Sequence, residues 1–379
     1  MDQKQRDSGG RTPLYAQVES YVRDQIRSGR WQPGRRLPSE NQLCKQFDVS
    51  RITIRGAMEK LVEEGVVYRI QGRGSFVADD AAGEPKRYPV GTSATHGDLL
   101  PVAVILPRLR GMLTTSLFAG VEQGLAASRY RILLLTTDDD QTREEEKLRE
   151  AIRAGARGMI VYPAEGRTYS EEMLRLTFDR YPIVVIDRYV RGVKTHCVCS
   201  DHFTGAYEAT EHLLRLGHRR IAFVTTPYLR TTSLEERMDG FRQALNDYGV
   251  VLDRSLVLEQ VEPEAISAFL AANADVTALF AVNEGIGQTA IRAAEASGKR
   301  VPADLSVVFF DDYDHAEAAR IPPTCVAQQG GLIGEQAAAR LLSLIADPLQ
   351  ERSMVRIPTR LIVRASTAAL AGEGQGAVE

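Results

Sequence analysis

The chain has 379 residues, 44% of them hydrophobic and 26% charged, which is enough for two or three domains with buried cores. No apolar run reaches the ~18 residues of a membrane span. The polar start MDQKQRDSGG lacks the apolar stretch of a signal peptide, and four cysteines are too few for a disulfide framework. We therefore expect a soluble cytoplasmic protein in a reducing compartment.

The net charge of −3 conceals an asymmetry along the chain. Residues 1–78 contain 14 Lys and Arg against 9 Asp and Glu, whereas the remaining residues contain 33 against 41. A basic head on an acidic body suits contact with nucleic acid at one end. On charge alone, a chance fluctuation is the competing explanation.

The chain opens with a predicted helix and a turn. Thr12 can cap a helix that begins at Pro13, because a proline lacks only an N–H that has no helical partner at that position. Gly29 ends this helix, and residues 31–34 (WQPG) form a turn. The apolar residues of the helix fall on one face at four-residue steps, namely Leu14, Val18, Val22 and Ile26.

A short second helix follows. Ser39, with Gln42 three residues later, gives a capping box at its start. Leu43 and Phe47 then point inward, and residues 48–49 make a tight turn. A third helix follows this turn.

The third helix has the properties of a DNA-recognition helix. Ser50 caps it and Gly65 ends it. Its inward face is apolar, with Ile54, Met58, Leu61 and Val62. Its first turns are polar, with Ser50, Arg51, Thr53 and Arg55. A recognition helix presents its N-terminal residues to base edges in the major groove, where the arginine fork matches guanine O6 and N7.

A two-stranded wing completes the head, with strands at 66–70 and 75–77 and a turn at 71–74 (QGRG). Arg73 at the wing tip can lie in the minor groove or along phosphates. Alone, QGRG also suits a phosphate loop or an ordinary hairpin, and Arg51 and Arg55 also suit a solvated helix face. The ordered set instead predicts a winged helix-turn-helix that binds DNA.

Residues 13–78 resemble the DNA-binding domain of the GntR family, through LPSE, VSRITIR and GRGSFV. The sequence departs from the family pattern at Ile52 and Gly56. A glycine inside a helix costs ~1 kcal/mol relative to alanine, so we expect Gly56 to permit a close approach to another group. With the wing-tip arginine added, the resemblance implies operator contacts from Arg36, Asn41, Ser50, Arg51, Thr53, Arg55, Gln71, Gly72 and Arg73.

Residues 79–100 lack apolar periodicity and are rich in small and polar residues, so we predict a linker. Beyond it, short apolar strands alternate with helical patterns. Predicted strands are 102–106, 131–137, 158–163, 182–187, 220–226, 278–283 and 305–311. Predicted helices are 115–128, 142–154, 203–216, 234–248 and 285–297. This alternation predicts an α/β body of parallel sheets covered by helices, divided into two doubly wound lobes.

Residues 101–365 resemble the sugar-sensing core of the LacI/GalR family, which is related to periplasmic sugar-binding proteins. The resemblance rests on DHFTGAYEATEHLLRLGHRRIAFVT (201–225), ERMDGFRQAL (236–245), residues 278–312 and IPPT (321–324). The combination of head and body resembles the chimeric arabinose-repressor type. It implies a winged-helix domain at 1–78, a linker at 79–100 and an effector-binding and dimerisation domain at 101–370, without a hinge helix.

Polar residues stand where strands of the body end, and ligands bind at the carboxyl ends of strands in open α/β sheets. The candidate ligand residues, which match family positions, are Asp187, Ser233, Arg237, Asn283, Asp311 and Gln328. The competing explanation for each is a helix cap or turn former. The loop at 111–118 (GMLTTSLF) lacks the common family motif, so the first-lobe side of the pocket is not defined.

Two other clusters suggest metals, and we assign neither of them a metal. His196, Cys197, Cys199 and His202 lack the second ligand pair of a tetrahedral site, and His196 points away from the two cysteines on a strand. Residues 138–140 and 144–146 are acidic runs typical of a solvated loop and a helix N-terminus. No catalytic arrangement accompanies a glycine elbow, so we expect neither catalysis nor a cofactor.

The sequence therefore predicts a sugar-responsive repressor that binds a pseudo-palindromic operator as a homodimer and makes no membrane contact. Two alternatives stay open at this point. One is an activator or architectural DNA-binding protein with a vestigial cleft. The other is a carbohydrate-active enzyme with a regulatory DNA-binding head.

Overall fold

A computed structural model describes residues 14–47, 49–70, 74–78, 99–166, 169–189, 192–226 and 231–370 of the protein. Contacts divide the chain into two units, Met1–Thr92 with Glu171–Tyr181 and Ser93–Ser170 with Pro182–Glu379. Helix α6 (Glu171–Phe178) lies in the first unit. The domain limits expected from the sequence stay a prediction. No helix within the described ranges is long and apolar enough to cross a membrane.

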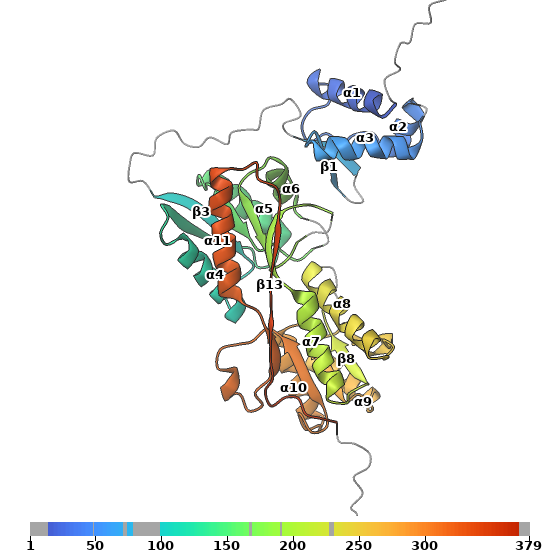
Figure 1. The fold of residues 1–379 in the computed structure, drawn as a ribbon, viewed down its shortest axis with the longest axis vertical. Helices are drawn as coiled ribbons and strands as arrows, with labels where there is room; N and C mark the ends of the chain where they lie inside the picture. Colours follow the sequence, from blue (N-terminus) through green and yellow to red (C-terminus); the bar gives the residue numbers. More distant parts are fainter. Residues whose placement is uncertain are drawn as a thin grey trace, which may run out of the picture. The chain divides into compact units, whose positions relative to one another are not determined.

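The N-terminal head is a winged helix-turn-helix, as predicted (Figure 1). Its elements are α1 (Leu14–Arg27), α2 (Glu40–Phe47), α3 (Arg51–Glu63), β1 (Val67–Ile70) and β2 (Gly74–Val77). The wing strands are antiparallel and Ile70 pairs with Gly74, so Gly74 begins the second strand rather than ending the turn. The predicted capping box is present, because the Ser39 amide donates to Gln42 Oε1 (2.8 Å) and the Gln42 amide donates to Ser39 Oγ (3.3 Å).

The head has one core, built from the apolar faces of its three helices. Val18, Val22, Leu43, Ile54 and Leu61 are completely buried. Trp31 closes the core from the turn after α1 and is 8% exposed. Thr12 and Pro13, predicted to start the first helix, lie outside the described residues.

The body consists of two α/β lobes, and each contains a six-stranded sheet within the described ranges. The first sheet is parallel throughout, in the order β13-β7-β6-β5-β3-β4. Its strands are β3 (Leu100–Leu106), β4 (Tyr130–Thr136), β5 (Met159–Val161), β6 (Ile183–Ile186), β7 (His196–Ser200) and β13 (Met354–Ile357).

The second sheet runs β14-β12-β11-β10-β8-β9, and only the β14 pairing is antiparallel among its described strands. Its strands are β8 (Ile221–Val224), β9 (Val257–Leu258), β10 (Ala278–Ala281), β11 (Ser306–Phe310), β12 (Thr324–Ala327) and β14 (Arg360–Ile362). The central strands are buried on both faces, which explains their unbroken apolar sequence.

Helices cover both sheets. The first lobe carries α4 (Met112–Leu125), α5 (Gln141–Arg153) and α11 (Gly330–Ala346). The second carries α7 (His202–Arg215), α8 (Thr232–Asp247), α9 (Pro263–Ala272) and α10 (Glu284–Ala296), with short 3-10 turns at Arg254–Leu256 and Ala316–Ala318. Helix α11 lies along α4 (Figure 1). A Cβ at Gly120 would come within 2.0 Å of the Gly331 carbonyl oxygen, so glycine permits this close approach.

Three chain segments connect the lobes. The chain leaves the first lobe between β7 and α7, returns between β12 and α11, and leaves again between β13 and β14 (Figure 1). The segments are bonded to each other, because the Asp201 amide donates to the Ile357 carbonyl (2.8 Å) and Gln329 Nε2 donates to the Pro358 carbonyl (2.7 Å). This is the two-lobed architecture that the sequence predicted.

Candidate DNA interface and ligand cleft

Helix α3 carries the candidate base-reading residues of the head. Ser50 Oγ accepts a hydrogen bond from the Thr53 amide (3.2 Å) and lies 2.9 Å from Thr53 Oγ1, so Ser50 caps the helix as predicted. Arg51 and Arg55 are exposed. They lie four residues apart and therefore on the same side of the helix.

Several other basic residues of the head form ion pairs, unlike these two arginines. Arg69 pairs with Glu40 (2.6 Å), Lys60 pairs with Glu19 (2.9 Å), and Arg23 pairs with Glu64. Within the described part of the head, neither Arg51 nor Arg55 has an ion-pair partner. Their charge is therefore available to a polyanion.

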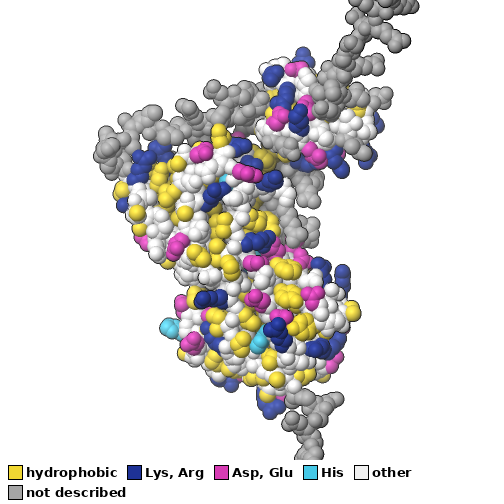
Figure 2. Space-filling model, viewed as in Figure 1, with side chains coloured by type: hydrophobic (Ala, Val, Ile, Leu, Met, Phe, Trp, Pro, Cys, Tyr) yellow, Lys and Arg dark blue, Asp and Glu magenta, His cyan; other side chains and the backbone are white. Residues whose placement is uncertain are grey.

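The remaining predicted DNA contacts are distributed around α3. Asn41 is exposed in the first turn of α2. Arg36 forms a β-bridge with Phe76, and a Cβ at Gly74 would lie 3.1 Å from Arg36 Nε, so the guanidinium packs against the base of the wing. The predicted wing-tip contacts Gln71, Gly72 and Arg73 lie outside the described residues. Figure 2 shows Lys and Arg side chains on the visible face of the head.

The explanation expected for Gly56 finds no support within the protein. Gly56 is exposed in the middle of α3, and a Cβ there would meet no atom within 4 Å. Among the described residues nothing lies close to this glycine, so the close approach expected from the sequence stays a prediction.

In the body, four of the six predicted ligand residues, Asp187, Arg237, Asp311 and Gln328, come together at the junction of the lobes. Asp187 follows β6, Asp311 follows β11 and Gln328 follows β12. Gln328 Nε2 donates to Asp311 Oδ1 (2.6 Å). Arg237, in the second turn of α8, lies with its guanidinium carbon 3.9 Å from the Phe310 ring centroid and donates to the Val282 carbonyl. Asn283 directly follows Val282 in the chain.

His202 links the two lobes at this site. Its Nδ1 accepts from Arg237 Nη2 (3.3 Å), and its Nε2 donates to the Asp187 carbonyl (3.4 Å). The ring is buried, and burial together with the Arg237 charge lowers the pKa of His202 to about 4. The imidazole is therefore neutral at pH 7, which matches one acceptor and one donor nitrogen. The sequence placed His202 only in a metal-like cluster and missed this position.

Two aspartates of the site have unusual backbones. Asp187 has φ 62° and Asp311 has φ 73°. Both values lie in the left-handed region, which residues other than glycine rarely adopt. Such conformations cluster at functional sites because the surrounding structure must maintain them. Burial raises the pKa of Asp311, while Arg237 and Gln328 oppose that shift.

Asn283 and Ser233 behave differently from this group. Asn283 Oδ1 accepts from the Ile286 amide (3.0 Å), so this side chain caps α10, which is the competing explanation given above. Ser233 is buried in the first turn of α8. The neighbouring Glu284 is half-buried, and burial followed by the charge of Asp311 raises its pKa.

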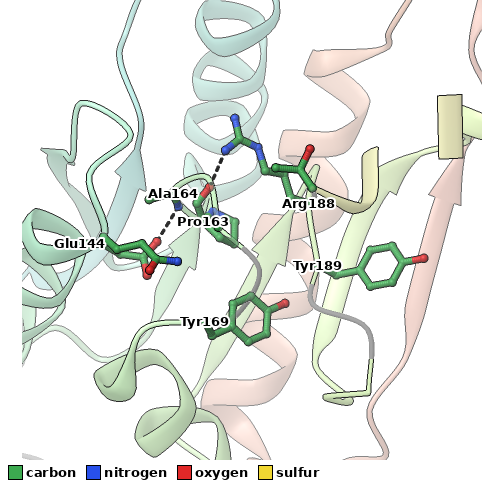
Figure 3. A pocket seen from close by; sticks show the side chains of 9 residues that line it. Glu144, Pro163, Ala164, Tyr169, Arg188 and Tyr189 are labelled. Carbon is green, nitrogen blue, oxygen red and sulfur yellow. Dashed lines mark hydrogen bonds between the residues drawn. The ribbon is translucent and has the colours of Figure 1, made fainter. Parts of the chain in front are cut away.

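The first-lobe side, which the sequence left undefined, contains a polar pocket (Figure 3). It is lined by Gln141, Glu144, Pro163, Ala164, Gly166, Tyr169, Arg188, Tyr189 and Thr231. Arg188 and Tyr189 directly follow Asp187, so the rule that selected strand-end residues could have found them.

Arg188 and Glu144 organise this pocket. Arg188 Nη1 donates to Asp139 (3.1 Å) and to the Pro163 carbonyl (3.2 Å). Glu144 accepts from the Ala164 amide (2.6 Å) and from Ser170 Oγ (2.8 Å), and its side chain is buried. Burial raises the pKa of Glu144. Glu144 lies in the first turn of α5, as the sequence predicted, and its carboxylate is buried.

The metal-like cluster is used structurally. Arg340 Nε donates to His196 Nδ1 (3.2 Å), and Cys197 and Cys199 are buried free thiols on β7. No group of three or more His, Cys, Asp or Glu side chains in the described ranges is arranged to hold a metal ion.

Family models and relatives identify the two parts. Residues 14–77 match the bacterial regulatory proteins of the gntR family, and residues 210–367 match the periplasmic binding protein-like domain. An arabinose metabolism transcriptional repressor from Geobacillus stearothermophilus is 30% identical over 374 residues, covering 94% of this chain and 98% of that protein. The chain belongs to the arabinose metabolism transcriptional repressor family. It is a transcriptional regulator with a GntR-type head and a LacI-type body, as the sequence predicted.

Other members and solved structures agree with this family assignment. A second arabinose metabolism transcriptional repressor, from Halalkalibacterium halodurans, is 27% identical and covers 93% of this chain and 96% of its own. A LacI family transcriptional regulator from Enterococcus faecium with bound ribose superposes with a TM-score of 0.60 at 27% identity, covering 72% of this chain and all of that one. The transcriptional regulator CelR in complex with cellobiose superposes with a TM-score of 0.62 at 25% identity, covering 84% of this chain and 91% of that one.

Proposed function

We propose that this family member is a repressor that binds operator DNA through its head and releases it when a sugar binds at the lobe junction. Asp187, Ser233, Arg237, Asn283, Asp311 and Gln328 are the proposed ligand residues. The sugar shifts the lobes and thereby changes how two heads of a homodimer fit the operator. A coupling of ~1–3 kcal/mol between the two sites is enough for such control.

Unpartnered buried polar atoms carry the effector proposal. Buried polar atoms are nearly always hydrogen-bonded, so each exception requires a reason. Within the part of the chain that the structure describes, three of the proposed ligand residues hold such atoms, namely Oδ1 of Asp187, Nε of Arg237 and Oε1 of Gln328. A carboxylate oxygen and an amide oxygen accept, and a guanidinium N–H donates. Sugar hydroxyls both donate and accept, so one polyhydroxyl ligand satisfies all three.

The DNA proposal rests on the two exposed arginines of α3, which form no ion pair with any described residue. Arg51 and Arg55 reach base edges, Thr53 and Ser50 lie at the helix start, and Asn41 and Arg36 lie beside them. The wing tip, with Gln71, Gly72 and Arg73, completes the proposed contact. A homodimer with one head per half-site requires a pseudo-palindromic operator.

The relatives' names make arabinose the first sugar to test, followed by ribose and cellobiose. A thermal-shift measurement on the full chain tests the effector proposal directly. A ligand present at ~100 times its dissociation constant stabilises by ~2.7 kcal/mol, which is a readily measured shift. The absence of a shift with any pentose, hexose, disaccharide or sugar alcohol would overturn the sugar assignment. We infer that the bound sugar is not turned over, and its recovery unchanged after incubation with the protein tests that inference.

A further inference from the structure

A polar contact joins the lobes beside the six proposed ligand residues, and one of its members, Tyr189, also lines the first-lobe pocket. Tyr189 follows β6 and Arg356 lies on β13, both in the first lobe. Thr232 and Glu236 lie one turn apart on α8 of the second lobe. These four residues are called the interlobe clasp below.

The clasp is densely hydrogen-bonded. Arg356 donates to both carboxylate oxygens of Glu236 (2.7 and 2.9 Å), and the Tyr189 hydroxyl donates to Glu236 Oε1 (2.6 Å). Thr232 Oγ1 accepts from the Tyr189 amide (3.0 Å) and donates to the Tyr189 carbonyl (2.7 Å). Arg356 and Glu236 are 120 residues apart in the chain, so they meet only when the lobes are in this arrangement.

Glu236 is the centre of the clasp. Its side chain is 9% exposed, compared with 37% for Arg356. Burial alone would raise the pKa of Glu236, but the hydrogen bonds from Arg356 and Tyr189 outweigh it and lower the pKa. A buried carboxylate held by a bidentate arginine is geometrically specific, and it destabilises the structure when its partner is removed.

The clasp shares its helix with the proposed ligand residues. Thr232 immediately precedes Ser233, and Glu236 immediately precedes Arg237. A rotation of α8 against the first lobe therefore moves both pairs together. We propose that the interlobe clasp sets the angle between the lobes, and that Tyr189, Glu236 and Arg356 are positioning residues for the effector site. Only the sugar-binding measurements that test this proposal rest on the proposed function.

The distance between the lobes tests the clasp without any effector. Spin labels at Glu146→Cys in α5 and Glu264→Cys in α9 report that distance, because both positions are exposed and lie in different lobes. Cys44→Ser removes the partly exposed native thiol, and the other three cysteines are buried. We expect one narrow distance distribution in the labelled parent and a broad or displaced one in E236Q/R356Q. Identical distributions in a folded E236Q/R356Q protein would overturn the proposal.

The effector arm uses the same variants. E236Q, R356Q and the double variant should each weaken sugar binding by roughly tenfold, and the double variant should be no weaker than either single one, because all three remove the same contact. High salt should weaken sugar binding in the parent but not in the double variant. Arg300→Gln removes an exposed ion pair with Asp304 within the second lobe and should change neither readout.

These outcomes separate the clasp from the sugar assignment. Unchanged sugar affinity in all three folded clasp variants would reject the positioning role. A parent protein that binds no sugar would instead reject the proposed function, while the label distances still decide whether the clasp sets the lobe angle.

Discussion

Substituting alanine for either of two glycines in the recognition region should change the stability of the head in opposite directions. Gly56 lies inside α3, is exposed, and would place an added Cβ in open space. Gly56→Ala should therefore stabilise the head by ~1 kcal/mol, because glycine loses more backbone entropy in a helix than alanine. Gly65 has φ 71°, so Gly65→Ala should destabilise the head by ~1–2 kcal/mol through left-handed strain.

The assay uses the single tryptophan of the chain. Trp31 is buried in the head core, so its fluorescence during urea unfolding of the full chain reports the head. With a denaturant slope of ~1 kcal/mol per molar, the midpoint should rise by ~1 M for Gly56→Ala and fall by ~1–2 M for Gly65→Ala. Shifts of both variants in the same direction would refute this reasoning.

Gly56→Ala also tests what approaches the helix. No described protein atom lies near the added methyl group, so the close approach expected from the sequence is left for the operator. Operator affinity should fall in this variant although the head becomes more stable. An operator affinity equal to that of the parent would show that the glycine has no role in DNA binding.

Arg51→Ala and Arg55→Ala should each weaken operator binding more than tenfold and reduce the salt slope by about one, with the Trp31 unfolding midpoint unchanged; parental affinity in both would reject α3 as the reading helix. Arg237→Ala should abolish the sugar-induced thermal shift while operator affinity stays intact, and a retained shift would remove Arg237 from the site. The pKa of His202 is about 4 in the folded protein, against 6.5 in the unfolded chain. The unfolded state therefore binds the proton first, and the body loses stability as the pH falls from 6.5 to 4. The acid loss of stability should therefore be shallower in His202→Asn, and an unchanged pH profile would contradict the assignment.

Periodicity predicted most strands of the body, including the edge strand β4, but it missed the interior strand β12 and the edge strands β9, β13 and β14. The central strands are buried on both faces and therefore read as apolar runs. Strand β13 carries three exposed residues, so nothing in its sequence distinguishes it from a loop. Helix α11 begins with two glycines, which usually argue against a helix. Here Gly330 permits the close approach to α4, because a Cβ at this position would come within 2.9 Å of the Leu113 carbonyl oxygen.

The site was predictable where it depends on sheet topology. The carboxyl ends of strands gave Asp187 and Asp311, but their left-handed backbones and the bridging His202 depend on how the lobes meet. Asn283 satisfied the same rule and serves as a helix cap. The contact between Glu236 and Arg356 joins distant parts of the chain, so no local sequence pattern reports it.

The central claim is that a sugar bound in the body weakens operator binding by the head. The most direct measurement selects an operator from random duplex DNA and titrates it with the full chain, by fluorescence anisotropy, with and without a saturating sugar found by thermal shift. We predict that the sugar lowers operator affinity by ~5–150-fold in the parent and leaves it unchanged in Arg237→Ala. A sugar that binds the body and leaves operator affinity the same would contradict it.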